Sequence, residues 1–502
     1  MRIVEVTKDF NRGTVNYKAG QSLVMAEDIE SQFRSVNGNC MGMSYPFETR
    51  YRKYNGEDLT NKRLLTFRTG GIGDIGFLSA IFPYLKNKYK NCFIRVATGC
   101  RQFLENVPWV DELHDMPFDA KLLDDCDYHL FYQGIIEGMS EKSKVTHAVD
   151  MFYSYFNIDS THIDPEFKKP RLVFSSEEMK WLESECNTLG IQKDDFVIGM
   201  QMETSAPLRN YPKEKLKVIV DVVAKEEKVR IVLIGNAQQT ILGGYLKGSY
   251  QNVVVATSYD VRKSMVLANR YNLVVSPDSF MVQVAGALDK PLIGIYGPFP
   301  SEVRMKYFKN AIGMESSVVC TPCYKHDYRA CIKGFPSPCF SLIEPEDVLQ
   351  AIDYQRHKFF GGHFKYMDPI LREPDFSEIE KYFLSADKGL CFFGTYYRHP
   401  NMIRVDTNRF VGADITDLNH PFEWRTFPFV LFMNNIGYKN GSIYQNCKNF
   451  VRPGGYFIIY REDCIDSAFV EVSRDVGKSF TILYSKFDPA TRKGLIVGRK
   501  AF

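Results

Sequence analysis

An aspartate behind a glycine turn is the first group in this 502-residue chain that could do chemistry. An apolar strand is expected over residues 63–69, glycines follow at 70, 71 and 73, and Asp74 precedes an apolar helix expected over 77–85. A strand, a tight turn and a helix N-terminus direct backbone N–H groups and the positive helix end to one point, which suits an anionic ligand. A carboxylate opposes an anion, so Asp74 either caps the helix or removes a proton from an attacking hydroxyl. This segment alone supports both interpretations equally.

A second set of polar groups follows strands that are expected further along the chain. Residues 197–201 predict a buried strand, and a polar loop over 202–211 leads to a helix that starts near Pro212. Further strands, each with a turn behind it, are expected at 230–234, 272–276 and 291–295. Ligands of open α/β sheets bind outside the carboxyl ends of the strands. We therefore expect these turns to line one cleft.

The order of these motifs resembles glycosyltransferase family 9, the heptosyltransferase-like enzymes of GT-B fold, over about residues 62–355. The resemblance implies an α/β chain with two Rossmann-like domains facing a cleft, 61–170 on the acceptor side and 171–360 on the nucleotide-sugar side. It implies an inverting transfer of a sugar from a nucleoside-diphosphate sugar to an acceptor hydroxyl, without a catalytic metal. Asp74 matches the proposed base of the family, which deprotonates the acceptor hydroxyl.

The resemblance also implies which residues bind the donor. Arg209 stands where the family usually has lysine, and a guanidinium can hold a diphosphate in a bidentate way. A lone arginine is more often a surface salt bridge, but its place between a strand and a Tyr-Pro helix start favours the diphosphate. Gln283 falls where many members carry histidine, and Gln238 and Gln239 fall where a glutamate often meets the ribose. The predicted donor-binding set is Gly71, Gly73, Thr204, Ser205, Arg209, Gly235, Asn236, Asp278, Ser279 and Gln283.

Four of the 12 cysteines lie in one segment, 320–339, with the spacing C-x2-C-x7-C-x7-C, namely Cys320, Cys323, Cys331 and Cys339. Thiolates at such spacing favour zinc or iron, and some family members carry a similar four-cysteine finger at this place. The polar start of the chain has no signal-peptide pattern, so we expect a reducing, cytoplasmic setting and no disulfide framework. A structural metal is therefore predicted, and the alternative is four buried thiols that hold a loop.

The two ends of the chain lie outside this resemblance. Residues 1–60 are expected to form an extension with a hairpin over 14–25 and a short helix over 26–33. Residues 363–502 resemble a class I methyltransferase in part, with acidic strand ends near 406 and 414, a fourth strand at 429–435, and a Pro-Gly-Gly turn with a fifth strand over 449–460. Residues 390–397 hold one glycine where several are expected, which favours a degenerate fold used for structure or acceptor binding.

The composition of the chain does not identify the molecule that accepts the sugar. The net charge of +3 is nearly balanced, and no apolar run reaches the roughly 20 residues of a transmembrane helix. The family favours a saccharide acceptor of the lipopolysaccharide-core kind, and the alternative is a phage-type enzyme acting on a hydroxymethylated base in DNA, which would need a basic groove. A non-catalytic binding protein with degenerate folds is the third hypothesis, and the joint presence of Asp74, Arg209 and Asp278 argues against it. The oligomeric state is not indicated.

Overall fold

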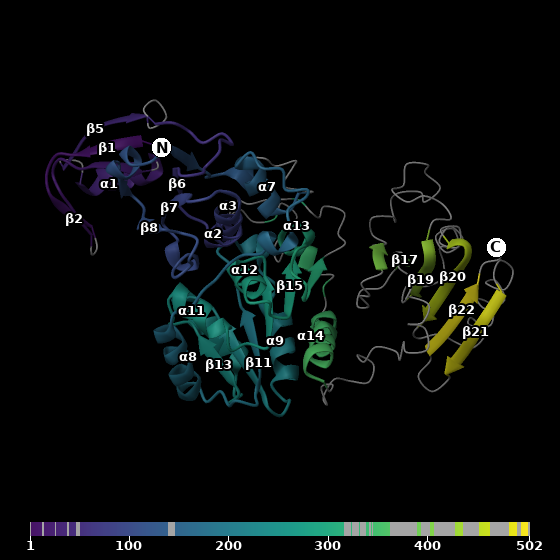
Figure 1. Cartoon of the computed structure of the whole chain (residues 1–502). Coiled ribbons are helices and arrows are strands. Elements are labelled where there is room, and N and C mark those ends of the chain that lie inside the picture. Colours follow the sequence, from purple (N-terminus) through teal and green to yellow (C-terminus); the bar gives the residue numbers. More distant parts are fainter. Residues whose placement is uncertain are drawn as a thin grey trace. The chain divides into compact units, whose positions relative to one another are not determined.

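The computed structural model divides the chain into two units (Figure 1). The first unit comprises Met1–Glu315, Pro322–Ser341 and Tyr354–Tyr366, and the second comprises Ser316–Thr321, Leu342–Asp353 and Met367–Phe502. The structure describes residues 2–12, 15–25, 27–37, 40–46, 51–138, 146–315, 323, 331, 338–340, 343, 345–361, 389–392, 402–405, 427–434, 451–461, 481–488 and 493–499. Among the helices described, none combines the length and apolar character that a membrane span needs.

The first Rossmann-like domain is built on a four-stranded parallel sheet of order β10-β6-β7-β8. Its strands are β6 (Arg63–Arg68), β7 (Phe93–Thr98), β8 (Glu112–Asp115) and β10 (Tyr128–Phe131). Its helices are α2 (Ile72–Ser79), α3 (Ile81–Lys88), α4 (Lys121–Asp124), α5 (Ile135–Gly138) and α7 (Ala148–Tyr155). The helix expected over 77–85 begins earlier, at Ile72, and is interrupted at Ala80. Pro83 lacks the N–H that would continue the helical hydrogen bonds across this point.

The second Rossmann-like domain carries a six-stranded parallel sheet of order β13-β12-β11-β14-β15-β16. This is the strand order of a doubly wound sheet, whose switch point lies between β11 and β14. The strands are β11 (Phe196–Gln201), β12 (Val229–Ile234), β13 (Val253–Ala256), β14 (Leu273–Pro277), β15 (Leu292–Tyr296) and β16 (Ala311–Glu315). The helices are α8 (Ser176–Thr188), α9 (Lys213–Val223), α10 (Thr240–Lys247), α11 (Val261–Ala268), α12 (Phe280–Ala287) and α13 (Glu302–Met305). The helix α14 (Pro345–Phe360) begins in the second unit and ends in the first. The predicted α/β architecture with two parallel sheets is thus confirmed.

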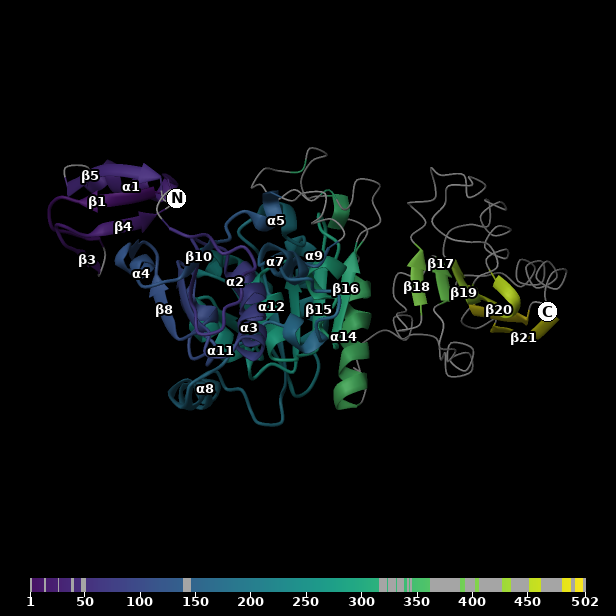
Figure 2. The same ribbon diagram turned by 45° about the horizontal axis from the view of Figure 1, so that its top comes forward.

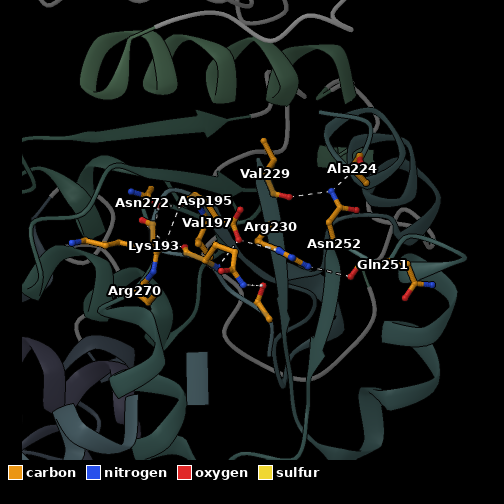
Figure 3. Close-up of polar contacts among 12 residues, drawn as sticks. Lys193, Asp195, Val197, Ala224, Val229, Arg230, Gln251, Asn252, Arg270 and Asn272 are labelled. Atoms are coloured by element: carbon orange, nitrogen blue, oxygen red, sulfur yellow. Dashed lines mark hydrogen bonds and ion pairs between the residues drawn. The ribbon is translucent and has the colours of Figure 1, made fainter. Parts of the chain in front are cut away.

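Polar side chains hold together the amino ends of these strands, away from the carboxyl ends (Figure 3). Arg230 at the start of β12 pairs with Asp195 before β11 at 3.1 Å. Asn252 before β13 donates to the carbonyl oxygens of Ala224 and Val229 at 2.9 and 3.0 Å. The contacts at the amino ends of the strands therefore stabilise the sheet, and the carboxyl ends are the ones at which a ligand can bind.

Two partly buried polar contacts join the Rossmann-like domains. Arg262 of α11 donates from Nη1 to the carbonyl oxygen of Gln102 in the first domain at 2.7 Å, and its Nε lies 2.6 Å from Glu178 of α8. Tyr307, in the second domain, donates its hydroxyl to Asp150 of α7 at 2.6 Å. The two domains are thus tied on both sides of their contact.

The N-terminal extension is part of the first unit rather than a free appendage (Figure 2). Its sheet has the order β5-β1-β4-β9, and β9 (Phe118–Asp119) comes from the first Rossmann-like domain. The other elements are β1 (Arg2–Val6), β2 (Phe10–Arg12), β3 (Val15–Tyr17), β4 (Ser22–Met25), α1 (Glu27–Asn37) and β5 (Met41–Pro46). The helix is confirmed, but the hairpin predicted over 14–25 is wrong, because β3 pairs with β2 and β4 pairs with β1.

In the second unit the structure describes a six-stranded sheet of order β18-β17-β19-β20-β22-β21. The strands are β17 (Gly389–Phe392), β18 (Met402–Val405), β19 (Phe427–Asn434), β20 (Val451–Arg461), β21 (Thr481–Asp488) and β22 (Lys493–Arg499). The first four in this order are parallel, and β22 is antiparallel to β20 and β21. Strands thus form at 402–405, 427–434 and 451–461 as expected, whereas the acidic residues predicted at the strand ends near 406 and 414 lie outside the described residues.

Candidate active site

One cavity of about 660 Å³ opens at the carboxyl ends of the strands in the second domain and is closed by α2 of the first. The structure places Asp74 and every predicted donor-binding residue on its wall. Residues that the sequence did not single out for the site also line it, namely Ile72, Phe77, Ile136, Gln201, Glu203, Ile234, Tyr259, Val261, Ser264, Phe280 and Arg304. Gln239 lines the cavity as well, whereas Gln238 does not.

A buried arginine positions the Asp74 carboxylate. Arg68 ends β6 with 2% of its surface exposed, and it donates to the carbonyl oxygens of Gly70 and Tyr132 at 2.6 and 2.7 Å. Its remaining Nη2 donates to Asp74 Oδ2. Asp74 lies in the first turn of α2 and does not cap the helix, because Gly71 is the N-cap and no side chain caps it. The capping interpretation of Asp74 is therefore wrong, and its carboxylate faces the cavity with a guanidinium behind it.

The glycine turn is required by this ion pair. Gly71 has a φ of 87°, and a Cβ there would lie 2.6 Å from Asp74 Oδ2 and 3.3 Å from Arg68 Nη2. Glycines also bring α2 against α12, since a Cβ at Gly76 would lie 3.0 Å from Gln283 Cβ and one at Gly73 would lie 3.9 Å from Phe280 Cα. The positive ends of both helices therefore meet at the cavity.

Two arginines flank Asp278 at the start of α12. Arg209 Nη1 donates to the Asp278 carbonyl oxygen at 2.9 Å and lies 3.6 Å from its Oδ2. Arg304 Nε lies 3.7 Å from Oδ1 of the same carboxylate. Ser279 caps α12 by accepting from the Met281 N–H at 3.2 Å. Cations and a helix N-terminus thus lie together at this end of the cavity.

The loop after β11 is held by Thr204. Its backbone N–H donates to Asn210 Oδ1 at 2.7 Å, and its hydroxyl donates to the Ala206 carbonyl oxygen at 2.9 Å. Thr204 therefore fixes the loop that carries Ser205, which is exposed, and Arg209.

The part of the cavity beside β12 is uncharged apart from one carboxylate. Asn236 and Gln239 form a capping box, and Gln239 Nε2 donates to Glu203 Oε2 at 3.3 Å. A Cβ at Gly235 would lie 2.4 Å from Gln239 Oε1, so glycine is needed for this arrangement. Beyond β12 the wall turns apolar at Ile234, Tyr259 and Val261. Burial and the hydrogen bond to Glu185 raise the pKa of Tyr259, so its hydroxyl stays protonated.

The four predicted metal ligands are only partly described. Cys320 lies outside the described residues, Cys323 is exposed, Cys331 is partly buried, and Cys339 is buried against Gly297. Among the described residues, no three His, Cys, Asp or Glu side chains lie close enough to hold a metal ion. Thiolate chemistry suits zinc or iron, but the described positions do not gather a site, and the metal stays a prediction.

Residues 129–331 match the family model of glycosyltransferase family 9 (heptosyltransferase). Lipopolysaccharide heptosyltransferase 1 of Campylobacter coli is 25% identical over 249 residues, which cover 47% of this chain and 68% of that protein. The solved glycosyl transferase family 9 protein of Veillonella parvula superposes with a TM-score of 0.50 at 16% identity, covering 61% of this chain and 100% of that one. For ADP-heptose LPS heptosyltransferase II of E. coli the TM-score is 0.45 at 17% identity, over 59% and 99% of the two chains.

The chain therefore matches family 9 proteins both in structure and in sequence. The solved Veillonella parvula protein superposes on 61% of this chain, and the family match, residues 129–331, includes β11 to β16. Over residues 129–331 this chain thus matches glycosyltransferase family 9, and its first unit has the GT-B fold of a solved family 9 protein.

Proposed function

We propose that the cavity binds a nucleoside-diphosphate sugar and that the enzyme transfers the sugar, with inversion at the anomeric carbon, to an acceptor hydroxyl. The observation that carries this proposal is the order of chemical groups along the strand ends. Along the strand order β13, β12, β11, β14, the wall is apolar behind β13 and carries amides behind β12. The loop behind β11 supplies a carboxylate, hydroxyls and Arg209, and Arg209 meets the helix N-terminus behind β14. A base, a ribose and a diphosphate need these groups in this sequence.

The distances along the sheet suit an extended ligand. Neighbouring strands lie about 4.8 Å apart, so the cationic end at β14 is about 10 Å from Gln239 behind β12. The donor would lie across the switch point, with its base against Tyr259 and Val261 and its ribose beside Glu203. Its diphosphate would lie beside Arg209 and the N-terminus of α12, and the transferred sugar below α2.

The mechanism follows from this orientation. The acceptor oxygen gives its proton to the Asp74 carboxylate and forms the bond to the anomeric carbon, while the bond from that carbon to the phosphate oxygen breaks. The electron pair leaves with the diphosphate, whose growing charge meets Arg209 and the helix N-terminus. Because Asp74 and the cations come from opposite domains, attack and departure take place on opposite faces of the sugar. Arg68 holds the Asp74 carboxylate, the proposed catalytic base, in place.

The acceptor we propose is a saccharide, because the Campylobacter coli relative is a lipopolysaccharide heptosyltransferase. The position of Asp74, Arg209 and Asp278 on one cavity favours an enzyme over a non-catalytic binding protein. Transfer to a hydroxymethylated DNA base has no observation in its favour. A cytoplasmic setting, in which thiols stay reduced, remains part of the proposal.

The rest of the chain is assigned more coarsely. We propose that 363–502 is a degenerate methyltransferase-like domain, which the adjacent parallel strands β19 and β20 support as its fourth and fifth strands. We also keep the four-cysteine site for structural zinc or iron. Metal analysis of the purified wild type beside Cys323→Ser tests it, since the proposal expects one bound metal that the variant loses.

Nucleotide binding tests the donor site. Thermal unfolding would be followed with ADP, UDP, GDP, CDP and dTDP for the wild type, for Arg209→Ala and for Arg230→Ala, a control at the far end of the sheet. A ligand at about 100 times its Kd adds roughly 2.7 kcal/mol of stability, which is easily measured. The proposal expects stabilisation by at least one nucleotide, lost in Arg209→Ala and kept in Arg230→Ala. No stabilisation of the wild type by any of the five would refute it.

A further inference from the structure

We infer that Arg304 is a second diphosphate-binding residue and acts together with Arg209; the inference rests on the proposed donor site. Arg304 belongs to α13, eight residues beyond Tyr296 at the end of β15. Only 5% of its surface is exposed, and it lines the cavity. A buried charge is costly unless it is paired and hydrogen-bonded, so the partners of this guanidinium decide its role.

Arg304 has weak partners among the described residues. Its Nη1 donates to the Val303 carbonyl oxygen at 3.4 Å, its Nε lies 3.7 Å from Asp278 Oδ1, and its guanidinium carbon lies 5.3 Å from the Phe299 ring centroid. A guanidinium offers five N–H donors, and none of these contacts is a short hydrogen bond. The side chain thus retains donors that an anion in the cavity can use.

Other buried arginines of the same unit differ in this respect. Arg262 is 8% exposed and makes hydrogen bonds of 2.5, 2.6, 2.7 and 3.0 Å. Arg68 is 2% exposed and makes bonds of 2.6 and 2.7 Å besides its ion pair with Asp74. Each of these two arginines thus makes at least two short hydrogen bonds to backbone carbonyl oxygens besides an ion pair, and each holds protein groups in place. Arg304 is buried to a similar degree without such short hydrogen bonds among the described residues, which is the pattern expected of a ligand-binding group.

The charges around Asp278 support an anion site. Arg304 faces one carboxylate oxygen at 3.7 Å and Arg209 the other at 3.6 Å, so two cations share one counter-ion. The excess positive charge lies at the N-terminus of α12, whose dipole adds to it. A diphosphate can accept from both guanidiniums, which charge-assisted hydrogen bonds make strong and directional. Asp278 then keeps the two cations together when the cavity holds no nucleotide.

The test separates diphosphate binding from folding. Affinities of ADP, UDP, GDP, CDP and dTDP, and of the corresponding nucleosides, would be measured by titration for the wild type, Arg304→Gln, Arg304→Lys and the control Arg230→Gln. We expect Arg304→Gln to lower the affinity for the nucleoside diphosphate about tenfold or more and to leave the affinity for the corresponding nucleoside unchanged. The diphosphate affinity of Arg304→Lys should lie between those of the wild type and Arg304→Gln. Arg230→Gln should bind like the wild type.

Two results would overturn the inference while the donor site stands. One is a diphosphate affinity of Arg304→Gln equal to that of the wild type. The other is an equal loss of affinity for the diphosphate and for the nucleoside in both Arg304 variants, which would indicate a structural role. If Arg304→Gln does not fold, Arg304→Lys decides by the same comparison. A wild type that binds none of the five diphosphates would refute the proposed function itself, and the inference with it.

Discussion

Replacement of Gly71 by alanine should damage sugar transfer far more than donor binding. An L-residue at the φ of 87° costs roughly 1–2 kcal/mol. The new Cβ would also lie 2.6 Å from Asp74 Oδ2, where ordinary contact begins at 3.4 Å, so the carboxylate must retreat by about 0.8 Å. A misplacement of about 1 Å can lower a rate by about 100-fold. We therefore expect the free energy of unfolding to fall by about 1–2 kcal/mol and the transfer rate by about 100-fold.

The measurements are urea unfolding, nucleoside-diphosphate release from the nucleotide sugar in the presence of acceptor, and nucleotide titration. Gly70→Ala is the matched control, because Gly70 lacks such a φ and a Cβ there meets no atom within 4 Å. The diphosphate affinity of Gly71→Ala should stay near that of the wild type, since Arg209 and Ser205 belong to the other domain. Equal losses in both variants, or a wild-type transfer rate in Gly71→Ala, would refute the role of the turn in placing Asp74.

Three further predictions follow. Glu203→Gln should abolish a preference of about tenfold for ribonucleotides over their 2′-deoxy forms, because the carboxylate lies where we place the ribose; titration with both forms checks this, and an undiminished preference contradicts it. Arg262→Met should lower the free energy of unfolding in urea by about 1–3 kcal/mol, since it removes the donor of the Gln102 and Val173 carbonyl oxygens and the ion pair with Glu178, and a loss below about 0.5 kcal/mol would speak against these contacts. Burial lowers the pKa of His129 to about 4 and of His147 to about 3, so the unfolded chain binds more protons than the folded one below the ordinary value of about 6.5. Stability should therefore be complete above about pH 6.5 and decline toward about pH 4, with a shallower decline in His147→Asn; an unchanged slope in that variant would refute the assignment.

Groups that directly follow a strand could be placed from the sequence. The segments expected at 197–201, 230–234 and 272–276 form β11, β12 and β14 within a residue or so at each end. Because parallel strands share one carboxyl edge, Arg209, Asn236 and Asp278 had to come together once the strands were recognised.

Groups whose position depends on side-chain reach or on long connections were missed. Arg68 is the one charged side chain at the carboxyl end of β6, yet its pairing with Asp74 depends on the turn at Gly71. Arg304 reaches the cavity through a helix well beyond β15, and no spacing rule indicates it. Glu203 follows a strand closely and could have been found as the carboxylate of its loop.

The hairpin predicted in the N-terminal extension was wrong for a related reason. The segment 14–25 was expected to pair with itself as a hairpin, but strand partners are chosen by burial over the whole fold. Ile3 and Val24 of the extension share a core with Phe67 and Phe118 of the first domain, so β4 pairs with β9 at a separation that no local pattern contains.

Asp74 is central to the proposed reaction, as the base opposite a bound donor. Asp74→Asn keeps an oxygen for Arg68 and removes the capacity to take a proton. The decisive measurement is the single-turnover transfer rate of this variant beside its nucleoside-diphosphate affinity. We predict a rate lower by about 10²–10⁴-fold with an affinity within about twofold of the wild type. A transfer rate close to that of the wild type, or loss of nucleotide binding with the rate, would contradict the assignment.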